Sequence, residues 1–165
     1  MRWLRRHSWW GLFAIAVLFV GFGIGDLLVG FTWDPGIPLG LVGLTPADLE
    51  GRGAEAYRML EFGTRVGGLS LMVTGALFIA VLLAGFRRNQ RWGWWTMWVM
   101  PAWMASISLL NLAFGVVPGQ APPPPMISGA VLAILAAAIQ VISARRFFGA
   151  WESTILAAPS TTERA

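Results

Sequence analysis

Residues 9–31 read WWGLFAIAVLFVGFGIGDLLVGF, an apolar run that only Asp26 interrupts with a charge. A helix rises about 1.5 Å per residue, so about 20 apolar residues cross the roughly 30 Å of hydrocarbon in a bilayer. Because lipid offers no hydrogen bonds, a segment that crosses it must pair its own backbone groups, as a helix does. The run therefore predicts a membrane-spanning helix over residues 9–31.

Three further apolar runs follow, at about residues 66–86, 92–117 and 126–143. Of the 165 residues, 56% are hydrophobic and only 12% are charged, and the mean hydropathy of +0.65 lies outside the range of ordinary soluble domains. We expect an all-α, polytopic membrane protein, a four-transmembrane-helix bundle that forms one domain over residues 1–154. Residues 155–165 are mostly small or polar and lack periodicity, so we expect a disordered tail there.

The arginines beside the apolar runs predict the orientation, because positively charged flanks of spanning helices stay in the cytoplasm. On one predicted side the runs are flanked by Arg2, Arg5, Arg6, Arg87, Arg88, Arg91, Arg145 and Arg146. In the outer loop, over residues 32–65, three arginines are balanced by five acidic residues. We therefore expect the N-terminus and the C-terminus in the cytoplasm.

The net charge of +4 comes from these arginines, so we attribute it to topology and expect no nucleic-acid partner. The chain has no lysine and is rich in Ala, Gly, Pro and Trp, which is typical of GC-rich bacterial genomes. We expect a multi-pass protein of the bacterial inner (plasma) membrane. The first run is too long for a signal-peptide core and lacks a small-x-small cleavage motif, so we expect it to be retained.

Tryptophans cluster on the same predicted inner side. An indole ring prefers the headgroup zone of a bilayer, which accommodates both its apolar body and its N–H group. The clustered residues are Trp3, Trp9, Trp10, Trp92, Trp94, Trp95, Trp98 and Trp151. We interpret nearly all ten tryptophans as an aromatic belt, with ligand stacking by Trp98 or Trp103 as the alternative.

The outer loop is expected to carry a short helix. Thr45 suits the N-cap position and Pro46 the first helical position, so a helix is predicted over Pro46–Glu50, ended by the glycines at 51 and 53. From Ala54 onward, charged residues at 55, 58, 61 and 65 recur three and four apart, which places them on one helical face. The second membrane helix is therefore expected to begin near Ala54 and to project above the bilayer.

Ionisable side chains inside the apolar runs need a reason, because each costs about 2.5–3.5 kcal/mol at the centre of a membrane helix. Asp26 lies five residues, about 7 Å, below the outer end of the first run. Arg65 and Asn111 fall at a comparable depth. We predict a polar pocket open to the outer side, formed by Asp26, Glu61, Arg65 and Asn111. The alternative is structural: an Asp26–Arg65 ion pair, with Asn111 hydrogen-bonded beside it, that ties three helices together.

Four secondary candidates are Trp103, Ser106, Ser108 and Gln140. Gln140 stands alone in the inner third of the fourth run, where we expect an interhelical hydrogen bond. Glycine pairs four apart, at 21/25 and at 63/67, are expected to permit close helix contact. Pro101 cannot donate a hydrogen bond to the carbonyl of Met97 and should kink the third helix.

Composition excludes several classes of site. The chain has no cysteine, and its single histidine, His7, lies beside arginines at the start of the first run, so we expect no metal or haem site. The sequence also lacks a glycine-rich phosphate loop, a Ser-His-Asp set and an HExxH motif. We predict no cofactor.

The segment TRVGGLSLMVTGALFIAVLLAGFRRNQRWGWWTMWVMP, residues 64–101, resembles a pattern in uncharacterised small bacterial four-helix membrane proteins. The residues that carry it are Arg65, Gly67, Gly68, Arg87, Arg88, Trp92, Trp94, Trp95 and Pro101. The layout is also loosely similar to DoxX-type four-helix proteins. Both resemblances imply a four-helix membrane fold, and neither assigns a reaction.

Three functions stay open. The leading prediction is a non-enzymatic accessory or small-molecule- or lipid-binding component of the membrane, acting alone, as a homo-oligomer or in a larger membrane complex. The second is an outer-leaflet enzyme or lipid-modifying protein, with Asp26 or Glu61 as acid or base and Arg65 holding an anionic head group. The third is an oligomeric transporter or channel subunit.

Overall fold

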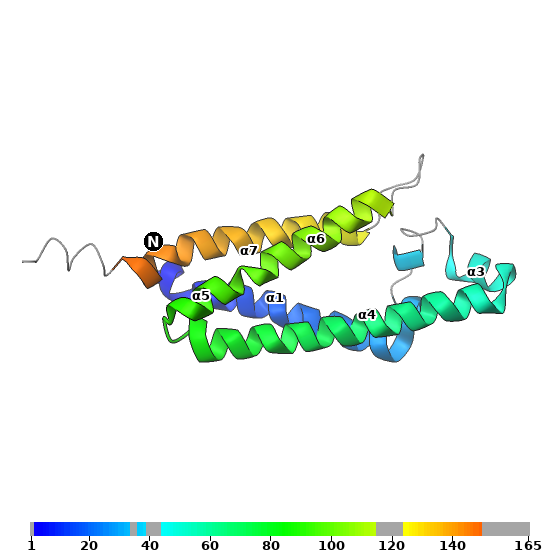
Figure 1. The fold of residues 1–165 in the computed structure, drawn as a ribbon, viewed down its shortest axis with the longest axis horizontal. Coiled ribbons are helices and arrows are strands. Elements are labelled where there is room, and N and C mark those ends of the chain that lie inside the picture. The colour runs from blue at the N-terminus through cyan, green and yellow to red at the C-terminus, as the bar shows by residue number, and fades with distance from the viewer. Residues whose placement is uncertain (1, 34–35, 39–43, 115–123, 150–165) are drawn as a thin grey trace, which may run out of the picture.

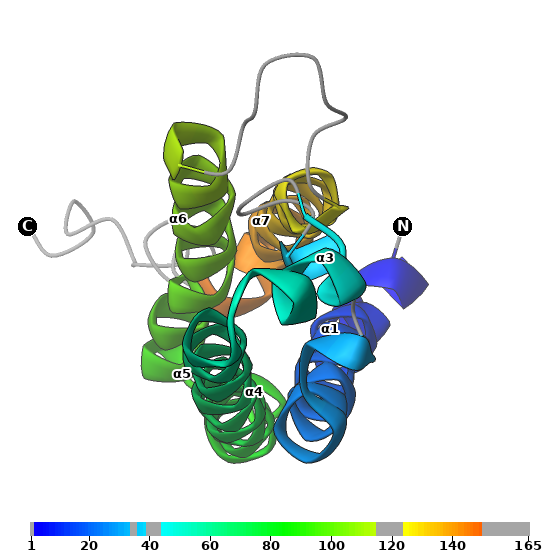
Figure 2. The ribbon, with the colours of Figure 1, turned by 90° about the vertical axis from the view of Figure 1, so that its right-hand side faces the viewer.

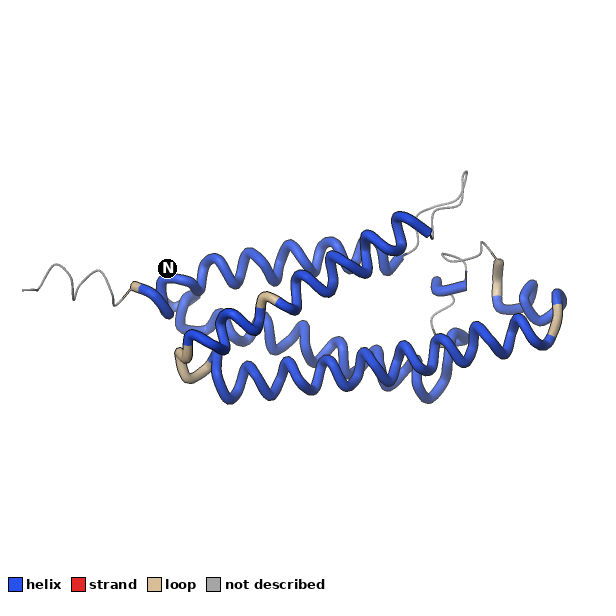
Figure 3. Tube along the Cα trace, in the orientation of Figure 1, coloured by secondary structure: helices blue, strands red, loops and turns tan. Residues whose placement is uncertain are grey.

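The computed structural model describes residues 2–33, 36–38, 44–114 and 124–149. The regular elements of this part of the chain are all helical (Figures 1 and 3). In chain order they are α1 (Arg2–Val29), the 3-10 turn η1 (Gly30–Thr32), α3 (Pro46–Arg52), α4 (Ala54–Val81), the π-helical turn η2 (Leu82–Phe86), α5 (Arg91–Met97), α6 (Val99–Phe114) and α7 (Pro124–Phe148).

Four helical stretches are long and apolar enough to cross a membrane: His7–Thr32, Ala54–Phe86, Arg91–Ala113 and Ile127–Phe148. They confirm the predicted all-α, multi-pass four-helix architecture. Two ends differ from the prediction, because α1 already begins at Arg2 and α7 continues to Phe148 instead of ending near 143. Apolarity marks only the part of a helix that lies in hydrocarbon, whereas the helix itself continues through its charged flanks. Residues 115–117 and the predicted tail, 155–165, lie outside the described residues.

The short outer helix and the start of the second membrane helix are both confirmed. Thr45 caps α3: its hydroxyl accepts a hydrogen bond from the backbone N–H of Asp48, and the Asp48 carboxylate accepts one from the backbone N–H of Thr45. This reciprocal pair is a capping box. The helix ends at Arg52, before Gly53, whose φ of 143° few other residues can adopt. Figure 1 shows α4 extending past the end of α1 to lie beneath α3.

The third span is interrupted where Pro101 was predicted to kink it. Trp98 separates α5 from α6, and its N–H donates to the carbonyl of Trp95 at 3.2 Å. The next regular helical bond in this region runs from the N–H of Ala102 to the carbonyl of Trp98, also at 3.2 Å. Pro101 has no N–H group for the carbonyl of Met97, which explains the position of the break.

The bundle consists of two helix pairs, α1 beside α4 and α6 beside α7, as the end-on view in Figure 2 shows. We call the end that carries the turn at Arg87–Gln90 the inner end and the end that carries α3 the outer end. Three glycines, Gly23, Gly68 and Gly75, bring α1 and α4 together. A Cβ atom on Gly23 would lie 2.6 Å from the carbonyl oxygen of Gly68, and one on Gly75 would lie 2.9 Å from the carbonyl oxygen of Ala16.

The glycines predicted to permit close helix contact are not the ones that lie at the α1–α4 contact. A Cβ atom added at Gly21, Gly63 or Gly67 would meet no atom within 4 Å among the described residues. Gly25 does lie against a neighbour, but that neighbour is the indole of Trp33 and not another helix. The apolar stripe of α1 that faces the bundle runs through Ala16, Phe19 and Gly23, so glycines on other faces point elsewhere.

The hydrophobic core occupies the inner half and the middle of the bundle. It comprises Leu12, Ile15, Ala16, Phe19, Phe78, Leu82, Phe86, Trp94, Met97, Met100, Met104, Ala133, Ala136 and Phe147. At its outer limit the ring of Phe19 contacts the rings of Phe78 and Trp103, at centroid distances of 6.1 and 5.3 Å. Trp94 belongs to this core with only 7% of its surface exposed, which corrects its assignment to the aromatic belt.

The basic segments meet at the inner end, as their flanking positions predicted. Arg146 of α7 donates from Nη2 to the carbonyl of Arg87 at 2.9 Å and from Nε to the side chain of Asn89. The guanidinium of Arg87 lies 5.4 Å from the ring centroid of Trp9, and that of Arg91 lies 5.5 Å from the ring of Phe148. The start of α1, the turn and the end of α7 therefore share one end of the bundle, whereas its cytoplasmic location remains a prediction.

Candidate functional site

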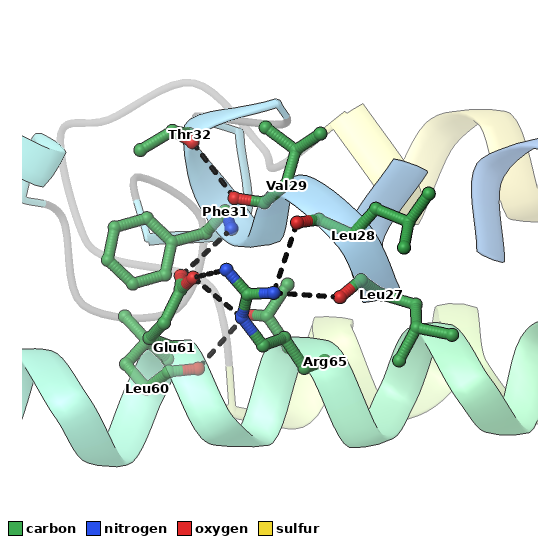
Figure 4. Close-up of polar contacts among 9 residues, drawn as sticks. Leu27, Leu28, Val29, Phe31, Thr32, Leu60, Glu61 and Arg65 are labelled. Atoms are coloured by element: carbon green, nitrogen blue, oxygen red, sulfur yellow. Dashed lines mark hydrogen bonds and ion pairs between the residues drawn. The ribbon is translucent and has the colours of Figure 1, made fainter. Parts of the chain in front are cut away.

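Arg65 lies at the centre of a polar cluster near the outer end of the α1–α4 pair (Figure 4). Its Nη1 atom donates to the carbonyls of Leu27 and Leu28, at 2.9 and 3.1 Å. Its Nε atom donates to Oε1 of Glu61 at 2.9 Å, and Nη2 lies 2.7 Å from the same oxygen. Glu61 and Arg65 are one helical turn apart, so the two side chains reach α1 from the same face of α4.

The end of α1 explains why a charged pair is needed there. The last carbonyls of a helix have no intrahelical donor and carry the negative end of the helix dipole, so a guanidinium placed against them is stabilising. Beyond them, the backbone N–H of Phe31 donates to Oε2 of Glu61 at 3.2 Å. Arg65 therefore satisfies acceptors of α1 while Glu61 satisfies a donor just after it. We call these contacts the α1 clamp.

Gly30 makes the α1 clamp possible. Its φ of 76° is left-handed, as is common just after the end of a helix, where glycine adopts the conformation without strain. A Cβ atom at Gly30 would also collide with the carboxylate of Glu61. The glycine thus turns the chain and leaves room for the carboxylate. Sequence reasoning missed this residue, although a glycine directly after an apolar helix is a recognised stop signal.

The ion-pair partner that the structure describes for Arg65 is Glu61, whereas the structural alternative predicted Asp26. Asp26 faces α4 nearby, because a Cβ atom on Gly68 would lie 2.7 Å from the Cβ of Asp26. The sequence gives the depth of a residue in a helix, whereas the choice between two carboxylates at similar depth depends on how the helices are rotated and on the position of the chain after α1. The structure brings Asp26, Glu61 and Arg65 together at the α1–α4 contact.

Asn111 is not part of the α1 clamp. Its Nδ2 atom donates to the carbonyl of Ile107 in its own helix at 2.9 Å. Trp103, Ile107 and Asn111 are all half-buried and four residues apart, so they form one stripe of α6. Because Trp103 contacts Phe19, this stripe faces α1. Asp26 follows Phe19 by seven residues on the same face of α1, and at its own level this face contacts α4.

The two serine candidates have local structural roles. The hydroxyl of Ser106 donates to the carbonyl of Ala102 at 2.9 Å, and that of Ser108 donates to the carbonyl of Met104 at 3.1 Å. Ser106 is exposed, whereas Ser108 is buried against α7, where a Cβ atom on Gly129 would lie 2.6 Å from its hydroxyl oxygen. Both hydroxyl groups thus use their hydrogen atoms within α6.

Gln140 is fully buried, but its amide does not make the predicted interhelical hydrogen bond. Its backbone carbonyl does so instead, accepting from Nε1 of Trp94 at 3.1 Å, and it also accepts from the hydroxyl of Ser143 within α7 at 2.8 Å. Neither Nε2 nor Oε1 of its side chain has a hydrogen-bond partner among the described residues. Sequence reasoning placed the residue correctly in the interior and assigned the bond to the wrong group.

The described residues contain no group of three or more His, Cys, Asp or Glu side chains that could hold a metal ion. Comparisons with protein-family models, with curated proteins and with solved structures find no match to this chain.

Proposed function

We propose that the chain is a non-enzymatic accessory component of the bacterial inner membrane that binds a lipid or hydrophobic small molecule. The proposed binding region lies between the outer halves of the two helix pairs, α1–α4 and α6–α7. Both termini lie in the cytoplasm in this proposal, so the binding region opens toward the outer leaflet.

The observation that carries the proposal is that the core fills the inner half and the middle of the bundle and stops short of its outer end. Outward of Met104, the described side chains of α6 have no buried member except Ser108, and Leu109 is 63% exposed. Figure 1 shows the ribbons of α4 and α6 diverging toward the outer end. In a bilayer, apolar side chains that the helices do not bury against one another are covered by lipid or by an apolar guest, since unfilled volume and buried water are both unfavourable there.

The polar residues at the rim suit a guest with a polar head. Asn111 lies on the stripe of α6 that faces α1, and Asp26 lies in the outer half of α1 where it contacts α4. Arg65 adds positive charge close by, with 41% of its side chain exposed. An amphiphile could place its apolar part against Ile107 and Trp103 and its head near these groups.

The α1 clamp argues against the enzymatic alternative. Both oxygens of Glu61 accept hydrogen bonds, and three of the five N–H groups of Arg65 are already donated to carbonyl or carboxylate oxygens in fixed geometry. Acid–base chemistry at Glu61 would require these contacts to break. Holding the end of α1 is a sufficient role for the pair.

A path for transport through one copy is also disfavoured. The buried polar residues among those described are Thr64, Ser108, Gln140 and Ser143. The first two lie toward the outer end and the last two toward the inner end. Between these levels the interior is lined by Met100, Met104, Ala133 and Ala136, which are apolar. A polar route would therefore require several copies.

Two matched tryptophan substitutions test the proposal. Ile107→Trp should fill the space between the pairs, whereas Leu109→Trp adds the same bulk on an exposed face of α6. Native mass spectrometry of delipidated protein should detect a retained lipid or small molecule in the wild type and in Leu109→Trp, but not in Ile107→Trp. Retention that is equal in all three proteins, or absent from the wild type, would refute the proposed region. Helix content and elution volume would verify that both variants fold.

A further inference from the structure

The break between α5 and α6 lies close to several buried polar groups that the α1 clamp and the proposed binding region do not involve. Gln140 has no exposed surface, and its side-chain Nε2 and Oε1 lack hydrogen-bond partners among the described residues. The Nε1 atom of Trp98 is likewise buried and lacks a partner within the described chain. A buried amide or indole N–H is unfavourable unless something accepts or donates its hydrogen bonds.

The backbone adds an acceptor at the same level. Met97 is fully buried, and the residue four positions later, which would normally donate to its carbonyl, is Pro101. Proline has no N–H group, so this carbonyl lacks its helical donor. The break thus leaves one backbone acceptor and one indole donor on adjacent residues, Met97 and Trp98.

Trp94 connects these groups to Gln140. Its Nε1 atom donates to the backbone carbonyl of Gln140 at 3.1 Å, and its ring contacts that of Trp98 at a centroid distance of 5.7 Å. Helices α5 and α7 run in opposite directions. Side chains tilt toward the N-terminus of their helix, so the Gln140 amide extends outward from the level of Trp94 toward that of Met97 and Trp98.

We infer that these groups form a second site, in the inner half of the bundle, which holds a neutral guest through a hydroxyl oxygen. A hydroxyl group can accept two hydrogen bonds and donate one. It can therefore accept from Trp98 Nε1 and Gln140 Nε2 and donate to the carbonyl of Met97 or to Oε1 of Gln140. The guest is a buried water molecule or the hydroxyl of a small molecule.

The surroundings determine that the guest is neutral. The side chains of the core at this level are apolar and fully buried, among them Leu12, Met97, Met100 and Ala136. An ion would lose its hydration there without gaining a counter-charge, whereas a water molecule needs only two to four polar partners. The site lies on α5 and α7 near the inner end, so it does not depend on ligand binding in the outer half.

The experiment compares the two buried indole N–H groups by NMR in detergent micelles. Trp94 is the internal control, because its N–H is already donated to Gln140. The Trp98 indole proton, assigned with Trp98→Phe, should show a nuclear Overhauser contact to water or to a non-protein molecule, and Trp94 should not. A contact at the water frequency without a mass adduct identifies water. A contact to another resonance, with an adduct that Gln140→Met loses, identifies a hydroxyl-bearing molecule.

A site that holds no guest would give a different spectrum. If the Trp98 indole proton shows contacts only to protein, the site is dry and the inference is wrong. In that case Gln140→Met should also raise the melting temperature, because it removes an unpaired amide from an apolar core. The wild-type spectrum decides the question even if the variant fails to fold. Loss of the outer ligand in Ile107→Trp would leave the contact of Trp98 unchanged.

Discussion

Nη1 of Arg65 lies 2.9 Å from the carbonyl oxygen of Leu27, and this hydrogen bond fixes α4 to the last turn of α1. The same guanidinium bonds Glu61, whose other oxygen accepts from the backbone N–H of Phe31. A cation, a carboxylate and the end of a helix thus satisfy one another at the outer end of the bundle. Each member can be removed separately, which makes the α1 clamp testable.

Replacing Arg65 by glutamine should destabilise the protein. The substitution leaves two carbonyls and the Glu61 carboxylate without their charged donor. Hydrogen bonds to charged groups contribute about 1.5–3 kcal/mol each when buried, and solvent reduces this strongly for a guanidinium that is 41% exposed. We expect a loss of about 2 kcal/mol in the free energy of unfolding, measured by SDS titration in mixed micelles. Arg65→Lys should recover only part of it, because an ammonium group lacks the planar fork. Arg58→Gln, at an exposed position of α4, is the control, and an equal loss there would argue against the α1 clamp.

Replacing Gly30 by alanine should also destabilise the end of α1. A left-handed backbone conformation costs a non-glycine residue about 1–2 kcal/mol, and the added Cβ would collide with Glu61. Gly51→Ala is the matched control, since a Cβ there meets no described atom within 4 Å. Thermal unfolding in detergent should show a lower melting temperature for Gly30→Ala. The melting temperature of Gly51→Ala should not fall. Equal melting temperatures would mean that the turn at Gly30 adapts freely.

Adjacent glycines in α4 provide a test of the helix contact. Gly68→Val should separate α1 from α4, because a Cβ atom at Gly68 would lie 2.7 Å from the backbone nitrogen of Leu27. Gly67→Val places the same side chain where no described atom lies within 4 Å. We expect a loss of about 1–3 kcal/mol for the first, as for overpacked cores, and little change for the second. The opposite order would show that the register of α1 against α4 is wrong.

Acid should loosen the start of α3 at its capping box. Hydrogen bonds from the side chain and backbone of Thr45 lower the pKa of Asp48 below its ordinary value of 3.8. A carboxylate whose pKa is lowered on folding stabilises the folded state fully above pH 3.8, and this contribution is lost as the pH falls through the lower, folded-state pKa. Backbone NMR shifts of Leu49 should therefore titrate below pH 3.8 and lose this dependence in Asp48→Asn. A midpoint at or above 3.8 would contradict the capping geometry.

Apolar run length and local signals were sufficient to predict most of the fold. A run of about 20 apolar residues in lipid has essentially one solution, and Thr45 with Pro46 specifies a helix start by chemistry local to the chain. Partner choice across helices was not predictable in the same way. Counting residues gave similar depths for Asp26, Glu61 and Arg65, but not the rotation of α1 that places Gly23 rather than Gly21 against α4.

The same limit applies to Gln140 and Gly30. A lone amide in an apolar run is expected to be buried, but which of its groups finds a partner depends on the side chain opposite, here Trp94. Gly30 carries no chemistry of its own, and its importance follows from the carboxylate that occupies the place of its missing Cβ. Such residues become visible only once the helices are placed in space.

The central claim is that the two helix pairs are joined in the inner half and separable in the outer half, where a lipid or hydrophobic molecule binds. Because the chain contains no cysteine, two spin labels can be placed uniquely, at Ala84 and Thr96 for the inner end or at Leu69 and Leu110 for the outer end, all exposed positions. Pulsed electron paramagnetic resonance in nanodiscs should give a narrow distribution of label-to-label distances for the inner pair, and lipid should not change it. The outer pair should give a broad distribution that narrows when lipid is restored after delipidation. An outer distribution as narrow as the inner one, and unchanged by lipid, would contradict the account.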